Sequence, residues 1–324
     1  MVLAPFILMQ TLMRTIALLI ILIVITVSCK KNDLTINSQA TVKSSGRYDK
    51  EIFSSVKTVS DILYGKALNI AGAQEELYMD VYEPDNDTAK KRAMIIFVHG
   101  GGWVSHGKDD GKELCALFAK KGYVTVSINY RLGIENPINE KTRGEAVYRG
   151  VQDIKAAVRY ARSNAPLYKI DTGQLFIGGY SAGAVNAVHA AYWNENEVPQ
   201  NIDKQKWGSL NSSSGENLNF SSDVQAVYSI AGSIGDTNWI QSGEPPVVCV
   251  HSKTDNLIPY ASGSDVYGIY VYGAAPILQK ATSVNVPVTI FTYENISHGA
   301  YLDQDNFTTT THAVNDFLYS RLKW

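Results

Sequence analysis

The sequence contains little cysteine and no long run of like charge. Three of its 324 residues are cysteine, and its formal net charge is −2. The longest basic run spans residues 90–92, so the charge pattern gives no sign of a nucleic-acid partner. No clustered set of ligand residues suggests a metal site, and we expect no metal and no cofactor. With 45% hydrophobic residues, the chain can bury a large core, most simply as one α/β domain.

The N-terminus has the features of a targeting segment. An apolar run at residues 16–25 follows Arg14 and is closed by small residues that end at Cys29. The apolar stretch is too short to cross a bilayer as a helix, which needs about twenty residues. The pattern resembles a bacterial lipoprotein signal, although Thr26 stands where a leucine is usual. The resemblance implies a signal peptide over residues 1–28 and lipidation of Cys29, with the rest of the chain tied to a membrane in the cell envelope, outside the cytoplasm.

Other interpretations of this region stay open. Met13 makes a more ordinary signal start than Met1, and an uncleaved membrane anchor over residues 2–27 is an alternative to lipidation. Residues 29–47 are polar and lack periodicity, which predicts a flexible tether. We therefore expect the folded domain to span residues 48–324.

Strands and helices alternate along this domain. Apolar runs and alternating patterns predict strands at residues 76–82, 93–98, 123–128, 175–178, 224–230, 246–250 and 286–291. Helical spacing predicts helices at residues 114–121, 145–164, 182–193 and 308–322. This alternation predicts a mostly parallel central sheet with helices on both faces.

Two features of the domain allow more than one interpretation. Residues 194–223 are polar and interrupt the alternation, either as a lid or binding excursion or as an insertion without consequence. Cys115 lies in a helical pattern and Cys249 in an apolar strand. Both are expected to fill core, but a disulfide between them stays open.

A glycine-rich turn follows the strand at residues 175–178. Residues 179–183 read G-Y-S-A-G and open a helix, which is the strand–turn–helix context of a nucleophile elbow. The serine must sit on a strained turn so that its hydroxyl projects above the sheet, and glycines two residues away on either side keep Cβ atoms out of the crossing. We therefore predict Ser181 as a nucleophile.

A second glycine-rich loop begins where the apolar strand at residues 93–98 ends. Residues 99–103 read H-G-G-G-W, the HGGG-type oxyanion loop of lipases and esterases. In that family the second and third glycines donate N–H groups together with the residue after the serine. The resemblance implies that Gly101, Gly102 and Ala182 form the oxyanion hole.

Chain order selects the base and the acid that a serine nucleophile needs. In enzymes with a nucleophile elbow of this kind, the catalytic residues follow each other along the chain as serine, then aspartate or glutamate, then histidine. Of the six histidines, His298 follows the last strand. Asp255 lies after the strand at 246–250, in a stretch that resembles H-G-x-x-D-x-x-V-P, and it matches the acid position there. Asp223 and Asp236 are weaker alternatives, because neither follows the strand next to the histidine loop.

Together these motifs resemble the α/β-hydrolases of the bacterial carboxylesterase, lipase and feruloyl-esterase-like group. They cover the chain from residue 93 to its C-terminus. Residues 129–132, N-Y-R-L, also resemble the hormone-sensitive-lipase branch, but residues 133–135 and the elbow depart from that branch. The resemblance implies an α/β-hydrolase fold and a serine carboxylic-ester hydrolase that works through a Ser-His-Asp triad and an acyl-enzyme intermediate.

The substrate is expected only by analogy to be a short-chain, aryl or glycan-linked ester. Four tyrosines follow the acid, at positions 260, 267, 270 and 272, and they either line an aromatic or sugar-bearing pocket or pack within the fold. A serine peptidase of the same fold and a non-catalytic binding lipoprotein are the alternative functions.

Overall fold

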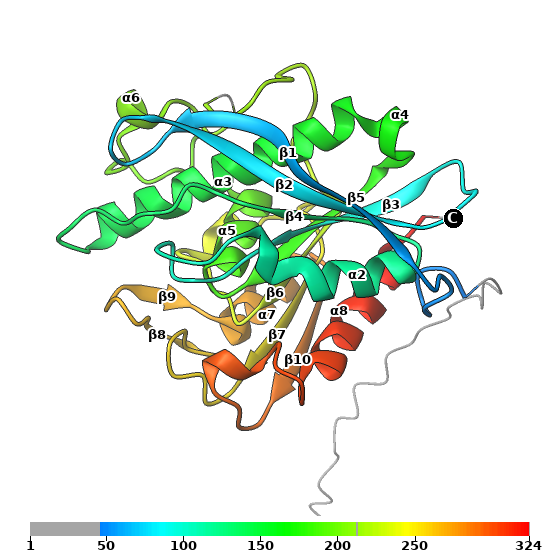
Figure 1. Cartoon of the computed structure of the whole chain (residues 1–324). Coiled ribbons are helices and arrows are strands. Elements are labelled where there is room, and N and C mark those ends of the chain that lie inside the picture. The colour runs from blue at the N-terminus through cyan, green and yellow to red at the C-terminus, as the bar shows by residue number, and fades with distance from the viewer. Residues whose placement is uncertain (1–45, 212, 324) are drawn as a thin grey trace, which may run out of the picture. The chain divides into compact units, whose positions relative to one another are not determined.

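The computed structural model describes residues 46–211 and 213–323 (Figure 1). The predicted signal peptide, Cys29 and nearly all of the predicted tether lie outside the described residues, and they stay predictions. Within the described part of the chain, no helix combines the length and the apolar character needed to cross a bilayer.

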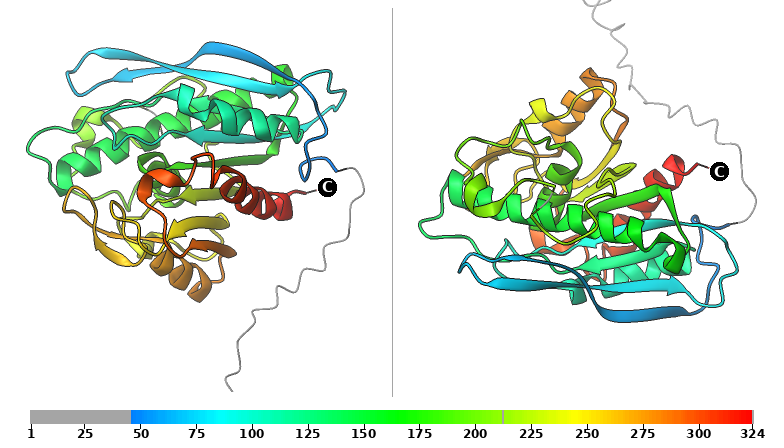
Figure 2. Two further views of the ribbon diagram at one scale, coloured as in Figure 1. Left: turned by 60° about the horizontal axis from the view of Figure 1, so that its bottom comes forward. Right: turned by 90° about the horizontal axis from the view of Figure 1, so that it is seen from above.

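An eight-stranded sheet runs through the domain in the order β1-β2-β4-β3-β5-β6-β7-β10. Its strands are β1 (Val56–Leu68), β2 (Gln74–Pro84), β3 (Arg92–Val98), β4 (Val124–Ile128), β5 (Ile170–Tyr180), β6 (Ala226–Ile230), β7 (Val247–Ser252) and β10 (Val288–Tyr293). The six strands from β4 to β10 in this order pair in parallel, whereas β2 pairs antiparallel with both β1 and β4. The β1–β2 hairpin forms one long edge of the sheet (Figure 2). The predicted mostly parallel sheet is confirmed.

Helices cover both faces of this sheet (Figure 1, Figure 2). They are α2 (Lys112–Lys120), α3 (Glu140–Ser163), α4 (Ala165–Tyr168), α5 (Ala182–Tyr192), α6 (Lys204–Trp207), α7 (Ala274–Ser283) and α8 (Phe307–Arg321). A separate two-stranded sheet, β8 (Ser262–Ser264) and β9 (Tyr270–Tyr272), lies between β7 and α7 in the chain.

The pleat of β3 explains how the two faces are filled. All seven residues of β3 are buried, as expected for a strand covered on both sides. Its residues 94, 96 and 98 belong to the core cluster that includes side chains of α3, α5 and α7. Its residues 93, 95 and 97 belong to the cluster with α2 and α8. Successive side chains of a strand point to opposite faces, so one continuous apolar run serves both cores.

Helix α3 begins earlier than the apolar spacing predicts, at residue 140 rather than 145. Asn139 caps it in a reciprocal box: its side chain accepts from the Thr142 N–H at 3.1 Å, and its own N–H donates to the Thr142 hydroxyl at 3.0 Å. Such caps are typically worth about 1 kcal/mol. The added turn carries Arg143, whose guanidinium lies 4.9 Å from the centroid of the Trp103 ring.

The segment at 194–223 is attached to the rest of the domain through buried polar groups. Ser214 donates its hydroxyl to Asp153 at 2.7 Å and accepts from Arg131 at 2.8 Å. The Gln152 amide donates to the carbonyl of Trp207 at 2.9 Å. These contacts join the segment to α3 and to the loop after β4, and its role as a lid stays a prediction.

The two described cysteines are buried and free. Cys115 belongs to the core cluster of α2 and α8, and Cys249 to the cluster on the opposite face of the sheet. Both fill core as expected, and the disulfide considered between them does not form.

Candidate active site

The predicted elbow serine lies in a strained turn between β5 and α5. Ser181 has φ 55° and ψ −123°, a left-handed conformation that costs energy for any residue with a side chain. The turn is held because the Ser181 N–H donates to the carbonyl of Ile230 at 2.9 Å and its carbonyl accepts from Val185 at 3.0 Å. This geometry matches the elbow predicted from the sequence.

Close backbone approach explains the two glycines of the elbow. A Cβ atom at Gly179 would lie 2.7 Å from the carbonyl carbon of Gly183. A Cβ atom at Gly183 would lie 2.6 Å from the carbonyl carbon of Val98, and closer still to that group's oxygen. Only glycine fits at these two positions, because the strand–helix crossing brings α5 directly onto β3.

Three side chains far apart in the sequence meet at this turn. His298 Nε2 lies 2.8 Å from Ser181 Oγ. On the other side of the ring, His298 Nδ1 lies 2.8 Å from Asp255 Oδ2 and 3.0 Å from Oδ1. With Nδ1–H donating to the carboxylate, Nε2 can accept the serine proton. The structure therefore brings together the three residues that the sequence proposes as nucleophile, base and acid.

Asp255 is held as a carboxylate by His298 and by three further donors. Its Oδ1 accepts from the N–H groups of Leu257 and Ile258 at 3.0 Å each, and its Oδ2 accepts from the hydroxyl of Tyr301 at 2.9 Å. Burial on its own raises the pKa of Asp255, but the hydrogen bond from His298, the imidazole's charge and the two backbone donors outweigh burial and lower it below the ordinary value.

Two tyrosines that the sequence analysis did not assign to the site hold the imidazole and the acid. The Tyr180 ring stacks on the His298 ring, with centroids 5.5 Å apart, and its hydroxyl donates to the His298 carbonyl at 2.5 Å. Tyr301 is fully buried, and its hydroxyl accepts from the Ser252 N–H at 2.6 Å while it donates to Asp255. Tyr180 lies inside the elbow motif, next to Ser181, so its place in the sequence could have indicated a role in the site. Tyr301 lies in no motif that could have indicated one.

Two other histidines, and the two aspartates considered as alternative acids, are not part of this triad. His189 is buried among aromatic rings, its Nδ1 donates to the Val185 carbonyl at 2.7 Å, and burial lowers its pKa to about 3. His251 Nε2 donates to the Ile258 carbonyl at 3.0 Å. Asp236 caps a short helical turn by accepting from Asn238 at 2.8 Å, and Asp223 is exposed.

The predicted oxyanion loop lies beside the serine. A Cβ atom at Gly100 would be 3.2 Å from the Cβ of Ser181. Gly101 and Gly102 both have positive φ, 95° and 60°. Among the described residues, none is an acceptor for the N–H groups of Gly101, Gly102 or Ala182. These donors are therefore available to an oxygen at the site, and Ala182 also opens α5, where helix N–H groups are unpaired.

His99 has a structural place in this loop. It is buried, its Nδ1 donates to the Gly100 carbonyl at 2.8 Å, and its ring stacks on Tyr130 with centroids 4.4 Å apart. Burial lowers the pKa of His99 to about 4, so the ring is neutral at pH 7. The next residue of the N-Y-R-L motif, Arg131, forms a buried ion pair with Asp153 at 2.8 Å. The motif thus supports the loop and the core.

The four tyrosines after the acid separate in the structure. Tyr260, Tyr267 and Tyr272 are partly buried and pack against the core cluster of α3 and α5. Tyr270 is 55% exposed. Packing within the fold therefore accounts for three of them, and Tyr267 also reaches the oxyanion loop, as described below.

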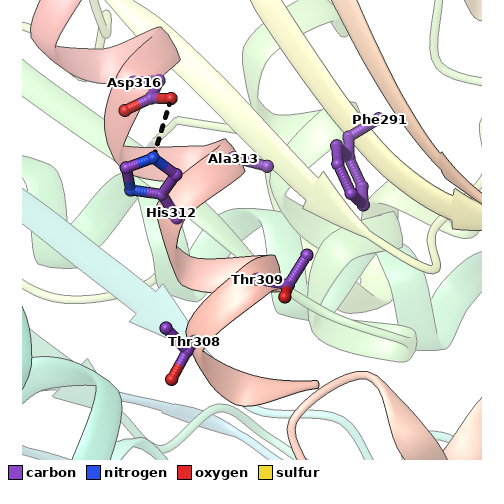
Figure 3. Close-up of a pocket in the computed structure, with 6 residues that line it drawn as sticks. All are labelled: Phe291, Thr308, Thr309, His312, Ala313 and Asp316. Carbon is purple, nitrogen blue, oxygen red and sulfur yellow. Dashed lines mark ion pairs between the residues drawn. The ribbon is translucent and has the colours of Figure 1, made fainter. Parts of the chain in front are cut away.

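A groove of about 380 Å³ lies between β10 and α8 (Figure 3). It is lined by Phe291, Thr308, Thr309, His312, Ala313 and Asp316. None of these belongs to the triad or the oxyanion loop, and His312 Nε2 lies 3.4 Å from Asp316 Oδ2. Within the described residues, no three His, Cys, Asp or Glu side chains are grouped to hold a metal ion.

Sequence comparisons link part of the chain to esterases. Residues 79–234 match the BD-FAE family model. Gut esterase 1 of Caenorhabditis briggsae is 33% identical over 112 residues, which is 34% of this chain and 20% of that protein. Esterase E4 of Myzus persicae is 31% identical over 136 residues, 40% of this chain and 24% of that protein. The matched region thus spans about a fifth to a quarter of the length of these curated relatives.

Solved structures resemble the chain over most of its length. The thermophilic esterase Est2 of Thermogutta terrifontis has a TM-score of 0.59 at 20% identity, covering 82% of this chain and 91% of that one. A truncated carbohydrate esterase from gut microbiota has a TM-score of 0.59 at 19% identity, covering 84% of this chain and 97% of that one. The likeness shows the fold, and the predicted α/β-hydrolase fold is confirmed.

Proposed function

We propose that this α/β-hydrolase is a serine carboxylic-ester hydrolase. The observation that carries the proposal is the continuous hydrogen-bonded line from Ser181 Oγ through His298 to Asp255, with both linking distances at 2.8 Å. The match of residues 79–234 to the BD-FAE family model and the partial matches to curated esterases support it.

In the proposed reaction His298 accepts the proton of Ser181 as the serine oxygen attacks the ester carbonyl. Asp255 orients the imidazole and stabilises its protonated form. The tetrahedral intermediate collapses, the alcohol leaves with the proton from His298, and an acyl-enzyme remains. A water molecule activated by His298 then attacks the acyl group and frees the carboxylic acid.

The oxyanion of each tetrahedral intermediate is assigned to the N–H groups of Gly101, Gly102 and Ala182. Loss of one such donor typically costs about 2.7–4 kcal/mol of transition-state stabilisation. The donors belong to the backbone, and they are set by the loop and helix geometry before substrate binds. The site therefore needs no metal or cofactor to stabilise negative charge in this scheme.

The substrate class we propose is an ester with a short acyl group, or an aryl or glycan-linked ester. The Thermogutta terrifontis esterase has been solved with propionate and with butyrate bound, and phosphorylated by paraoxon. The carbohydrate esterase among the structural neighbours supports the glycan-linked alternative. We also propose that the enzyme is lipid-anchored through Cys29 in the cell envelope, on the sequence pattern alone.

The test compares wild-type protein with Ser181→Ala on p-nitrophenyl acetate, butyrate and octanoate, and on a feruloyl ester and a matched amide. We expect Ser181-dependent turnover of at least one ester and much slower turnover of the amide. Equal turnover by the folded Ser181→Ala variant would remove the serine from the mechanism. Faster cleavage of the amide would favour a peptidase.

A further inference from the structure

Two carbonyl groups of the oxyanion loop are held by local contacts. The Gly100 carbonyl accepts from the His99 ring at 2.8 Å, and the Gly101 carbonyl accepts from the Val104 N–H at 3.0 Å. A peptide unit is planar, so holding a carbonyl also fixes the direction of the N–H group that follows it. These two contacts therefore orient the N–H groups of Gly101 and Gly102.

The next carbonyl of the loop is held from a distant part of the chain. The Tyr267 hydroxyl, between β8 and β9, donates to the Gly102 carbonyl at 2.8 Å across 165 residues of sequence. Burial raises the pKa of Tyr267, which keeps the hydroxyl protonated as a donor. The fit is close, since a Cβ atom at Gly102 would lie 2.5 Å from the Tyr267 oxygen.

The peptide unit that Tyr267 holds is under conformational strain. It joins Gly102 to Trp103, and both residues have positive φ, 60° and 63°. A tryptophan keeps such a conformation only where its surroundings fix it, and a glycine beside it offers little resistance to a flip of the peptide. This peptide lies at the centre of the turn that the Val104 N–H closes onto the Gly101 carbonyl. A flip here would disturb that turn, and with it the contact that orients the Gly102 N–H.

Tyr267 is itself held through Asp265, whose carboxylate also forms an ion pair with Arg143. Asp265 Oδ1 accepts from the Tyr267 N–H at 3.0 Å and from the Ile269 N–H at 3.1 Å. Asp265 Oδ2 lies 3.0 Å from Arg143 Nη2 in the first turn of α3, and both side chains are at most 5% exposed. A buried pair of this kind fixes the relative position of the elements that carry it.

The ion pair leads back to the oxyanion loop. The Arg143 guanidinium lies over the Trp103 ring, 4.9 Å from its centroid, and the Trp103 Nε1–H donates to Asn186 in α5 at 2.8 Å. The oxyanion loop thus contacts Tyr267 at one point and Arg143 at another. Asp265 connects these two residues. We call these three side chains the oxyanion clamp.

We propose that Tyr267 is a positioning residue for the oxyanion hole, and that the Arg143–Asp265 pair holds it in place. The proposal rests on the ester hydrolysis proposed above. The clamp acts on donors that bind the oxyanion more strongly than the ground-state carbonyl. Its loss therefore lowers kcat and leaves KM nearly unchanged.

The first test compares Tyr267→Phe with Tyr270→Phe, a matched change on the same two-stranded segment whose side chain is exposed. Wild type and both variants are assayed on the best ester found above. We expect kcat of Tyr267→Phe to fall roughly 10- to 100-fold with KM changed less than about threefold, and Tyr270→Phe to match wild type. A Tyr267→Phe variant with wild-type kcat, or with a loss confined to KM, would overturn the proposal.

The second test reads the clamp without the reaction. Amide hydrogen exchange of residues 99–105 is measured in wild type, Tyr267→Phe, Asp265→Asn, the double variant of these two, and the control Tyr270→Phe. We expect faster exchange of this loop in both single variants, little further change in the double variant, and wild-type exchange in Tyr270→Phe. Unchanged exchange in Tyr267→Phe would overturn the clamp even if the enzyme is an esterase. Absence of Ser181-dependent hydrolysis in wild type would instead overturn the proposed function.

Discussion

Replacing Gly183 by alanine tests how tightly the elbow is built onto β3. The new Cβ would lie 2.6 Å from the carbonyl carbon of Val98. Carbon atoms prefer to be about 3.5–4.0 Å apart, so α5 or β3 must move by about 1 Å. Both belong to the buried core, where such overpacking typically costs about 1–3 kcal/mol.

The same movement should disturb the reaction, because Ser181 directly precedes this helix. Its contact with His298 is 2.8 Å long, and a displacement of about 1 Å in a reacting group can cost roughly 100-fold in rate. We therefore expect Gly183→Ala to lose about 1–3 kcal/mol in urea unfolding and about 100-fold in kcat/KM for the best ester.

Gly173→Ala is the matched control. Gly173 lies in β5, the strand that leads into the elbow, and its new Cβ would meet its neighbours no closer than 3.4 Å, an ordinary contact. We expect it to stay within about 0.5–1 kcal/mol of wild type in stability and to keep wild-type activity. A Gly183→Ala variant that is as stable and active as Gly173→Ala would refute the close-approach reasoning.

Three further predictions concern the acid and the N-terminus. Tyr301→Phe removes a hydrogen bond to a charged carboxylate and leaves the buried Ser252 N–H without its acceptor, so we expect about 2–4 kcal/mol lower stability in urea unfolding, whereas an unchanged midpoint would contradict this. Because the pKa of Asp255 is lowered in the folded state, its contribution to stability is complete above roughly pH 4 and is lost as the pH falls through the folded-state value. The decrease in unfolding free energy from pH 7 to pH 3 should therefore be smaller in Asp255→Asn than in wild type, and equal decreases would contradict the shift. Cys29→Ser should move the protein from the membrane to the soluble fraction of a bacterial host, and an unchanged distribution would exclude the lipid anchor.

Local sequence patterns predicted the buried strands and the motifs because these depend on neighbours in the chain. The continuous apolar run of β3 is explained by a strand buried on both faces. The elbow is set by glycines within two residues of the serine. The triad needed one rule beyond the local pattern, the chain order of this fold, which selected His298 and Asp255.

The elements that the sequence did not predict lack such patterns. β1 is an edge strand with mostly exposed residues, and its register shifts near Asp61, so alternation is lost. α7 contains Pro276, which normally argues against a helix. There it is the third residue of the helix, in the first turn, where a backbone N–H has no helical partner to lose.

The supporting side chains of the site were not predicted because their contacts are non-local. Tyr180 reaches the His298 carbonyl across 118 residues and Tyr267 reaches Gly102 across 165. A single sequence records which residue stands at each position but not which distant backbone group it meets. The start of α3 was placed late for a different reason, since Thr142 completes the capping box where a glutamate or glutamine is the usual signal.

Reaction with a fluorophosphonate, followed by mass spectrometry of the peptides, tests the triad most directly. An activated serine beside an oxyanion hole should give one adduct per chain, on Ser181, and the folded His298→Ala variant should react far more slowly because the serine loses its base. An adduct on another residue, or equal labelling of wild type and His298→Ala, would contradict the assignment of these side chains to one catalytic unit.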